Sequence, residues 1–184
     1  MGTILIVANQ TLGGPELDRA VHDRIERGAT DFHVLVPITA PQSETREWKR
    51  GFEVGTSDVL TRLGGVALVE EDASSDRAAR EMEQRAREDE SRFDEARARA
   101  EQRLEQMLER VRSAGGQADG EVGDADPAVG VQRLLEGRSF DEIIISTLPA
   151  RFSRWLKMDV TSRVSRMTDA PVTTVEAEAG ELTS

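Results

Sequence analysis

Short apolar runs alternate along the chain with segments of helical periodicity. Residues 4–8 and 32–36 are near-continuous apolar runs, which are typical of parallel strands covered on both faces. Between them, residues 15–27 begin with proline and carry apolar side chains at helical spacing. The pattern therefore predicts a strand, a loop, a helix and a second strand that stops before Pro37, which lacks the N–H needed in the ladder.

The second half of the chain repeats this alternation. Residues 117–122 are a weak strand that suits a sheet edge, residues 127–135 are helical, and residues 143–145 and 172–175 are apolar strands. Strands that alternate with helices indicate an α/β protein with a parallel sheet and helices on both faces.

Two stretches of the chain are longer than a minimal version of this fold requires. Residues 37–75 contain glycine and proline with scattered apolar positions and predict a long excursion. Residues 76–112 are rich in Arg, Glu and Ala and free of Gly and Pro, so they predict an extended charged helix, which at about 1.5 Å per residue must project or break. We interpret residues 37–92 as an insertion-like loop and protruding helix.

The remaining organisation is simple. We expect one domain over residues 1–184, with a flexible tail at 176–184. The apolar stripe of the charged helix lies mostly in its C-terminal half. Its first half is therefore either a solvated helix or an arm that contacts a second subunit.

The amino-acid composition excludes several kinds of site and partner. The chain has no Cys and a net charge of −11. The absence of Cys excludes disulfides and thiolate zinc sites and fits a reducing, cytoplasmic compartment. The negative charge argues against nucleic acid or an anionic membrane as partner, and the N-terminal apolar run is too short for a signal peptide or a membrane span.

One segment of this acidic chain is basic. Residues 150–168 carry a net charge of +4, and the basic members are Arg151, Arg154, Lys157, Arg163 and Arg166. They indicate either an anion site or a solvated helix face that balances acidic neighbours.

Sequence motifs nominate no enzyme. There is no dinucleotide-binding or phosphate-binding glycine loop, no nucleophile elbow and no zinc-protease motif. The two histidines, His22 and His33, are expected to be a surface and a packed residue. The abundant carboxylates of residues 76–112 lie on an exposed helix, which does not shift their pKa values enough for acid–base chemistry.

A ligand crevice is expected past the carboxyl ends of the strands, where the strand order reverses. The loops at 9–14 and 146–159 and the turn at 123–127 should meet there. Gly13 and Gly14 either present N–H groups to an anion or permit a tight turn, and we favour the turn.

The chain resembles the universal stress protein family. The resemblance rests on residues 140–147, the Ser153-Arg154 pair, residues 160–164 and residues 170–175. It implies an open five-stranded parallel α/β sheet in the order 3-2-1-4-5, a homodimer that pairs through the last strand, and an adenine nucleotide in the crevice of those members that bind one.

The resemblance also marks candidate site residues. They are Asn9, Gly13, Gly14, Val36, Gly123, Thr147, Arg151, Ser153, Arg154, Lys157 and Asp159. Asn9 stands where the family usually has Asp, and Leu148-Pro149 and Met158-Asp159 replace glycine positions of its nucleotide loop. We expect Asp159 to cap a helix over 160–167 and to oppose a triphosphate.

Together these features predict a non-enzymatic, dimeric stress or regulatory module that acts through an unidentified protein partner. We expect no cofactor and poor or absent ATP binding. The alternative is a regulator that binds ATP or another adenine nucleotide through a phosphate site rebuilt from Arg and Lys side chains.

Overall fold

The computed structural model describes residues 2–8, 11–12, 14–38, 73–148 and 159–177. The chain divides into two compact units. One comprises Met1–Thr39 and Arg97–Ser184, and the other comprises Ala40–Ala96. The first unit contains the whole sheet.

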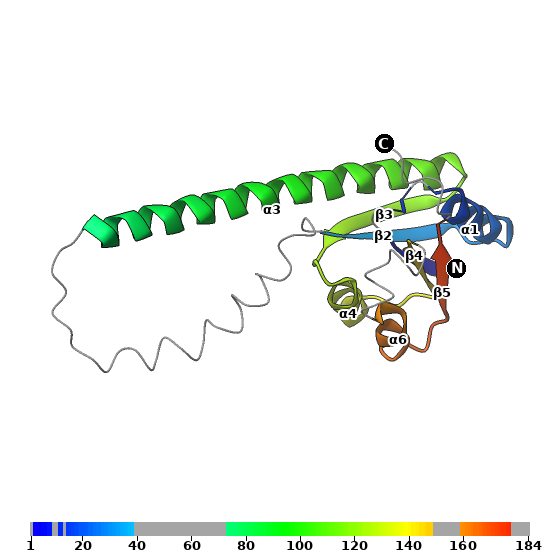
Figure 1. Cartoon of the computed structure of the whole chain (residues 1–184). Coiled ribbons are helices and arrows are strands. Elements are labelled where there is room, and N and C mark those ends of the chain that lie inside the picture. Colours follow the sequence, from blue (N-terminus) through cyan, green and yellow to red (C-terminus); the bar gives the residue numbers. More distant parts are fainter. Residues whose placement is uncertain (1, 9–10, 13, 39–72, 149–158, 178–184) are drawn as a thin grey trace. The chain divides into compact units, whose positions relative to one another are not determined.

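Five parallel strands form that sheet, in the order β3-β2-β1-β4-β5 (Figure 1). They are β1 (Thr3–Val7), β2 (Asp31–Pro37), β3 (Gln117–Gly123), β4 (Glu142–Thr147) and β5 (Val172–Glu176). The predicted sheet and its order are confirmed. β2 ends one residue later than predicted, because Pro37 occupies its last position, opposite Gly123.

Helices cover both faces of the sheet, as predicted. They are α1 (Pro15–Glu26), α3 (Ala73–Ser113), α4 (Pro127–Gly137) and α6 (Val160–Ser165). Side chains alternate between the faces of a strand. Ile4 and Ile6 of β1 therefore pack in a cluster with α1 and the C-terminal part of α3, whereas Leu5 and Val7 pack with α4 and α6.

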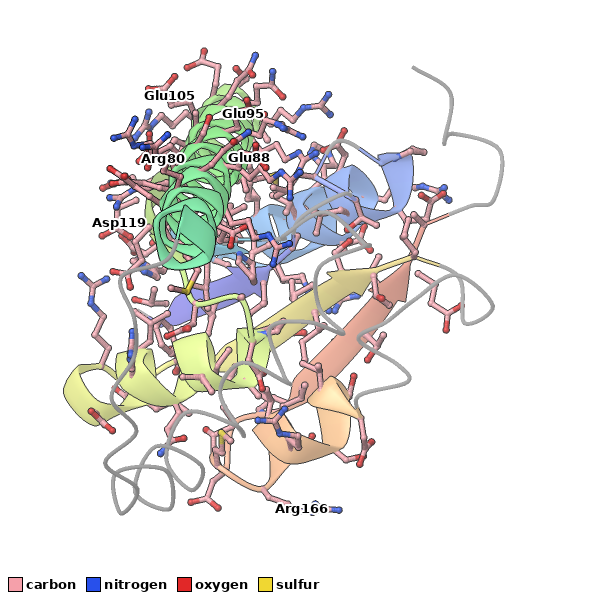
Figure 2. The ribbon with its side chains drawn as sticks, turned by 60° about the vertical axis from the view of Figure 1, so that its left-hand side comes forward. Arg80, Glu88, Glu95, Glu105, Asp119 and Arg166 are labelled. Carbon is pink, nitrogen blue, oxygen red and sulfur yellow. The ribbon has the colours of Figure 1, made fainter. Side chains whose placement is uncertain are left out.

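α3 is the extended charged helix. It runs for 41 residues from Ala73 to Ser113 without interruption, so the predicted alternative of a break is wrong. Acidic and basic side chains project from it, among them the labelled Arg80, Glu88, Glu95 and Glu105 (Figure 2). Ion pairs one turn apart support it, such as Arg97–Glu101 at 3.0 Å. The protrusion of its first half stays a prediction.

No helix within residues 14–38, 73–148 and 159–177 is both long and apolar enough to cross a membrane.

Candidate functional site

The carboxyl ends of the strands meet at one edge of the sheet. β1 lies between β2 and β4. The connection after β1 leads to β2 on one side, whereas the connection after β4 leads to β5 on the other side, so the strand order reverses between β1 and β4. Val7 near the end of β1 is level with Leu35 of β2 and Ile145 of β4. This is the switch point at which open α/β sheets bind ligands, and it lies where the sequence predicts it.

Five of the predicted site residues can be placed. Val36 is fully buried in the core of the α1 face. Gly123 ends β3, and its carbonyl accepts the N–H of Ile38 at 3.2 Å. Thr147 ends β4, is 3% exposed, and its carbonyl accepts the N–H of Ala177 at 2.9 Å. Gly14 and Asp159 are treated below.

The other six predicted residues lie outside the described part of the chain. They are Asn9, Gly13, Arg151, Ser153, Arg154 and Lys157. Their roles stay predictions.

Gly14 closes a turn at the start of α1. Its N–H donates to the carbonyl of Thr11 at 3.2 Å, and its own carbonyl accepts the N–H groups of Leu17 at 3.1 Å and Asp18 at 3.2 Å. Pro15, the next residue, has no N–H. The geometry of Gly14 therefore agrees with the turn interpretation, and the start of α1 has few N–H groups left for an anion.

Asp126 closes the start of α4 in a similar way. One oxygen of its carboxylate accepts the N–H of Ala128 at 2.9 Å, and its carbonyl accepts those of Val129 at 3.1 Å and Gly130 at 3.2 Å. The same carboxylate accepts Nη1 of Arg163 at 2.9 and 3.2 Å. Arg163 of the basic segment therefore balances an acidic neighbour, one of the two predicted interpretations.

The predicted cap by Asp159 is wrong. Asp159 occupies the N-cap position of α6, but it has φ 53° and ψ 38° and its side chain makes no capping hydrogen bond. A capping residue normally has an extended backbone, which turns its side chain toward the first N–H groups. The left-handed conformation does not provide that geometry. α6 also ends at Ser165, two residues earlier than predicted.

Two buried polar atoms at the same edge were missed from the sequence. Thr11 is 5% exposed, and its Oγ1 has no hydrogen-bond partner among the described residues. In the first turn of α1, Glu16 accepts Nη2 of Arg19 on Oε1 at 2.9 Å, while its buried Oε2 has no partner within the part of the chain that the structure describes. No local signal marks such atoms, because a missing partner is a property of the folded surroundings.

The histidines behave as predicted. His22 is exposed and lies 3.3 Å from Glu26. His33 is buried at 2% exposure, and its Nδ1 lies 2.6 Å from Oδ1 of Asp119. Burial raises the pKa of Asp119, but the hydrogen bond and charge of His33, together with Arg138, outweigh it and lower that pKa.

Two hollows lie away from the carboxyl edge. One of about 530 Å³ is lined by α1 and the end of α3, including Val21 and Met107. The other, of about 610 Å³, lies at the amino edge of the sheet, beside Asp119 and Arg138. Among the described residues, no group of three or more His, Asp or Glu side chains is placed to hold a metal ion.

Comparisons with known proteins find likeness at the level of structure. No protein-family model and no curated protein matches the sequence. A universal stress protein from Archaeoglobus fulgidus solved in complex with dAMP is 12% identical. The match covers 95% of this chain and 98% of that one, with a TM-score of 0.50.

Two further solved structures are similar over comparable lengths. Another structure of a universal stress protein from Archaeoglobus fulgidus is 10% identical, with coverage of 95% and 93% and a TM-score of 0.48. A universal stress protein in complex with cAMP is 12% identical, with coverage of 97% and 100% and a TM-score of 0.44. At these identities the likeness concerns the fold.

Proposed function

The chain has the universal stress protein fold, and on that premise we propose that it is a non-enzymatic, dimeric stress or regulatory module that binds ATP poorly or not at all. The observation that carries the proposal is that most N–H groups at the starts of α1 and α4, at the carboxyl edge, are already hydrogen-bonded within the protein. Phosphate groups bind at helix starts through unpaired N–H groups and the helix dipole.

The starts of α1 and α4 keep few of those donors. In α1, the turn at Gly14 and the missing N–H of Pro15 leave few donors, and the carboxylate of Glu16 lies in the same first turn. In α4, Asp126 holds the N–H of Ala128 by its side chain and the next two by its carbonyl. A phosphate approaching either start meets a carboxylate and few free donors.

The loop after β4 supports the proposal in a different way. Leu148 follows Thr147 where the family pattern has a glycine, so a side chain stands where backbone should approach phosphate. Asp159 adds a negative charge before α6. Because its side chain does not bind the first N–H groups of α6, its opposition to ATP is only electrostatic.

Dimerisation through β5 is supported by the edge position of that strand. Ile143 donates its N–H to Pro171 at 2.9 Å, and Ala177 donates its N–H to Thr147 at 2.9 Å. In this parallel ladder the N–H of Thr174 therefore points away from β4. An exposed strand edge of this kind is a template for pairing with a second copy.

Light scattering at micromolar concentration tests the dimer. Thr174→Pro removes the outward N–H and should convert the dimer to monomer without disturbing the β4–β5 ladder. Thr174→Val is the matched control, because it removes only the hydroxyl, which lies 3.2 Å from Oγ1 of Thr161, and it should stay dimeric. A monomeric wild-type protein would overturn this part of the proposal.

The alternative is an adenine-nucleotide-binding regulator that holds phosphate with Arg151, Arg154 and Lys157. It is supported by the basic segment and by a dAMP complex among proteins of this fold. Calorimetry with ATP, ADP and AMP separates the two proposals. We expect weak or no binding of ATP. Micromolar affinity that falls in the Arg154→Ala, Lys157→Ala double variant would replace the first proposal by the alternative.

A further inference from the structure

β3 lies at the edge of the sheet opposite β5 (Figure 1). Within its ladder, Gln117 donates its N–H to the carbonyl of Thr30 at 2.7 Å, and the carbonyl of Gly123 accepts the N–H of Ile38 at 3.2 Å. Alternate residues of a parallel strand bond to the same neighbour, and the register runs without a shift between these two ends. The odd-numbered residues of β3 therefore bond to β2, and the even-numbered residues turn their backbone groups outward.

The outward groups belong to Ala118, Gly120 and Val122. Arg112 of α3 donates from Nη2 to the carbonyl of Ala118 at 2.8 Å. The N–H of Ala118 and both backbone groups of Gly120 and Val122 have no hydrogen-bond partner among the described residues. All three residues are only partly buried. The row from residue 118 to 122 is about 13 Å long, at about 3.3 Å per residue, and such a row is a template for an added strand.

Acidic side chains line this edge on the face that α4 covers. Side chains alternate between the faces of a strand, and Glu121 lies opposite Leu35, whose side chain packs in the core on the α4 side. Asp119, labelled in Figure 2, lies two residues earlier and shares that face. Its side chain is 66% exposed and contacts His33 and Arg138. Glu121 is exposed and has no ion pair within the described part of the chain, so its charge is not balanced there.

The charge of the edge selects its occupant. Two copies of β3 that pair antiparallel about Gly120 would bring Asp119 of one copy opposite Glu121 of the other, and like charges in directly opposed positions are destabilising. The edge therefore disfavours a second copy, in contrast to β5, whose Thr173 and Thr174 are uncharged. A segment with Arg or Lys at alternate positions places cations beside both carboxylates, while its main chain bonds to the outward groups.

We propose that β3 is a docking edge for an extended segment of a partner protein that carries Arg or Lys at alternate positions. The segment adds one strand to the sheet. Its main chain pairs with Gly120 and Val122, and its basic side chains lie beside Asp119 and Glu121. The inference rests on the proposed function, a module that acts through a protein partner, and adds where that partner docks and what chemistry it carries.

The first experiment measures peptide binding by calorimetry. The probe is a capped heptapeptide of alternating Arg and Thr, which should bind the wild-type protein with a dissociation constant of about 100 μM. The same peptide with Glu in place of Arg should not bind. The Arg–Thr peptide with methylated backbone nitrogens keeps its charge but loses its main-chain donors, and it should bind about tenfold more weakly. Equal binding of the methylated peptide would show attraction by charge alone and would overturn the added strand.

Variants of the edge separate its backbone from its charge. Val122→Pro removes one outward N–H and should weaken binding of the Arg–Thr peptide about tenfold. Val122→Ala is the matched control, because it shortens the side chain and keeps the N–H, and it should bind within about twofold of wild type. Glu121→Gln should weaken binding about threefold, whereas Glu26→Gln, on α1 and 67% exposed, should not change it. Unchanged binding by Val122→Pro would overturn the proposal.

Hydrogen exchange of the wild-type protein gives a readout that does not depend on how a variant folds. A saturating Arg–Thr peptide should slow exchange of the amides of Gly120 and Val122 about tenfold. Unchanged exchange with the peptide bound would place the peptide elsewhere and overturn the docking edge. Protection of the same amides without peptide, rising with protein concentration, would assign the edge to a second copy and would overturn it as well.

The outcomes separate the docking edge from the proposed function. If the Arg–Thr peptide does not bind up to millimolar concentration while the protein is a dimer with weak ATP binding, the docking edge is wrong and the proposed function stands. If the wild-type protein is monomeric or binds ATP at micromolar concentration, the proposed function fails, whatever the peptide does.

Discussion

The two edges of the sheet use their carboxylates differently. At the amino edge, both oxygens of Glu142 are occupied. Arg24 donates from Nη2 at 2.6 Å and from Nε at 3.2 Å, and Thr173 donates at 2.8 Å. At the carboxyl edge, Glu16 has one occupied oxygen and one buried oxygen that no described residue contacts by a hydrogen bond. The network around Glu142 is closed and stabilises the fold, whereas Glu16 keeps one buried oxygen without a partner among the described residues. Such atoms are not confined to the carboxyl edge, because buried Nε2 of His33 in β2 also has no partner there.

The packing around glycine residues also differs between the middle of the sheet and its carboxyl edge. Gly120, in the middle of β3, is closely packed: an added Cβ would clash with the carbonyl oxygen of Val34 and lie 2.8 Å from Cδ1 of Leu104. At Gly14 the nearest atom would be 3.4 Å away. The middle of the sheet is therefore packed too tightly for a Cβ at Gly120, whereas a Cβ at Gly14 would make ordinary contacts.

The largest effect should follow from filling the close-packed position. Gly120→Ala forces β2 and β3 apart and should lower the free energy of unfolding by about 3 kcal/mol. Urea unfolding followed by circular dichroism measures it. Gly14→Ala is the matched control: Gly14 is the N-cap of α1, where alanine is less favourable than glycine, so it should lower the free energy of unfolding by only about 0.5–1 kcal/mol. Equal losses in the two variants would contradict the difference in packing between the regions.

The next effect tests the closed network. Arg24→Ala leaves Glu142, whose side chain is 20% exposed, without its main partner. The free energy of unfolding should fall by about 2 kcal/mol, since a largely buried charge loses its counter-charge. Arg97→Ala is the control: its pair with Glu101 is exposed, at 60% and 55%, and should contribute less than about 0.5 kcal/mol. A loss in Arg24→Ala no larger than in this control would show that the amino-edge network stabilises little.

The same network should make stability depend on pH. The hydrogen bond from Arg24 lowers the pKa of Glu142, outweighing burial, with help from Thr173. The unfolded chain, with an ordinary pKa of about 4.3, therefore binds the proton first as pH falls. The stabilisation is complete above about pH 5 and is lost as pH falls through the ordinary value toward the folded one.

Unfolding of wild type and Glu142→Gln across this range measures that loss. The wild type should be more stable by about 1 kcal/mol at neutral pH, and the difference should shrink below about pH 4.5. Asp119, whose pKa is also lowered, is present in both chains and cancels in the comparison. A difference that is constant with pH would mean that the charge of Glu142 contributes nothing.

The elements of the fold could be predicted because their signals are local. The apolar runs of β1 and β4 and the helical spacing of α1 are set by residues close in sequence. Even β3, with alternating exposed and partly buried positions, could be recognised as an edge strand from its polar composition. The order of the strands could not be predicted from local signals, because it depends on contacts between distant segments. That prediction came only from the family resemblance.

The site was predicted less well, for the same reason. Arg24 and Glu142 are 118 residues apart, and Arg163 and Asp126 are 37 apart, so no local pattern joins them. The rule that places Asp at helix starts predicted the position of Asp159 but not its left-handed backbone. The hydroxyl of Thr11, which has no partner among the described residues, could not be predicted either, because a missing partner depends on distant segments.

The smallest effects concern Asp159, where backbone and charge can be separated by three variants. At φ 53° glycine carries no steric penalty, and asparagine tolerates this region about as well as aspartate. Asp159→Gly should therefore raise the free energy of unfolding by about 0.5 kcal/mol, Asp159→Asn should leave it unchanged, and Asp159→Ala should lower it by about 0.5 kcal/mol. Urea unfolding measures all three. An alanine variant as stable as the glycine variant would contradict the left-handed conformation.

ATP binding by the same variants isolates the charge. Asp159 is exposed, so salt screens its field over about 8 Å at physiological ionic strength, and removing it should improve ATP affinity only about threefold. Asp159→Asn and Asp159→Gly should gain equally if the charge is the obstacle, and the gain should vanish in 1 M salt. A gain confined to Asp159→Gly would assign the obstacle to the backbone conformation. No gain in either variant would leave the occupied starts of α1 and α4 as the cause of weak ATP binding.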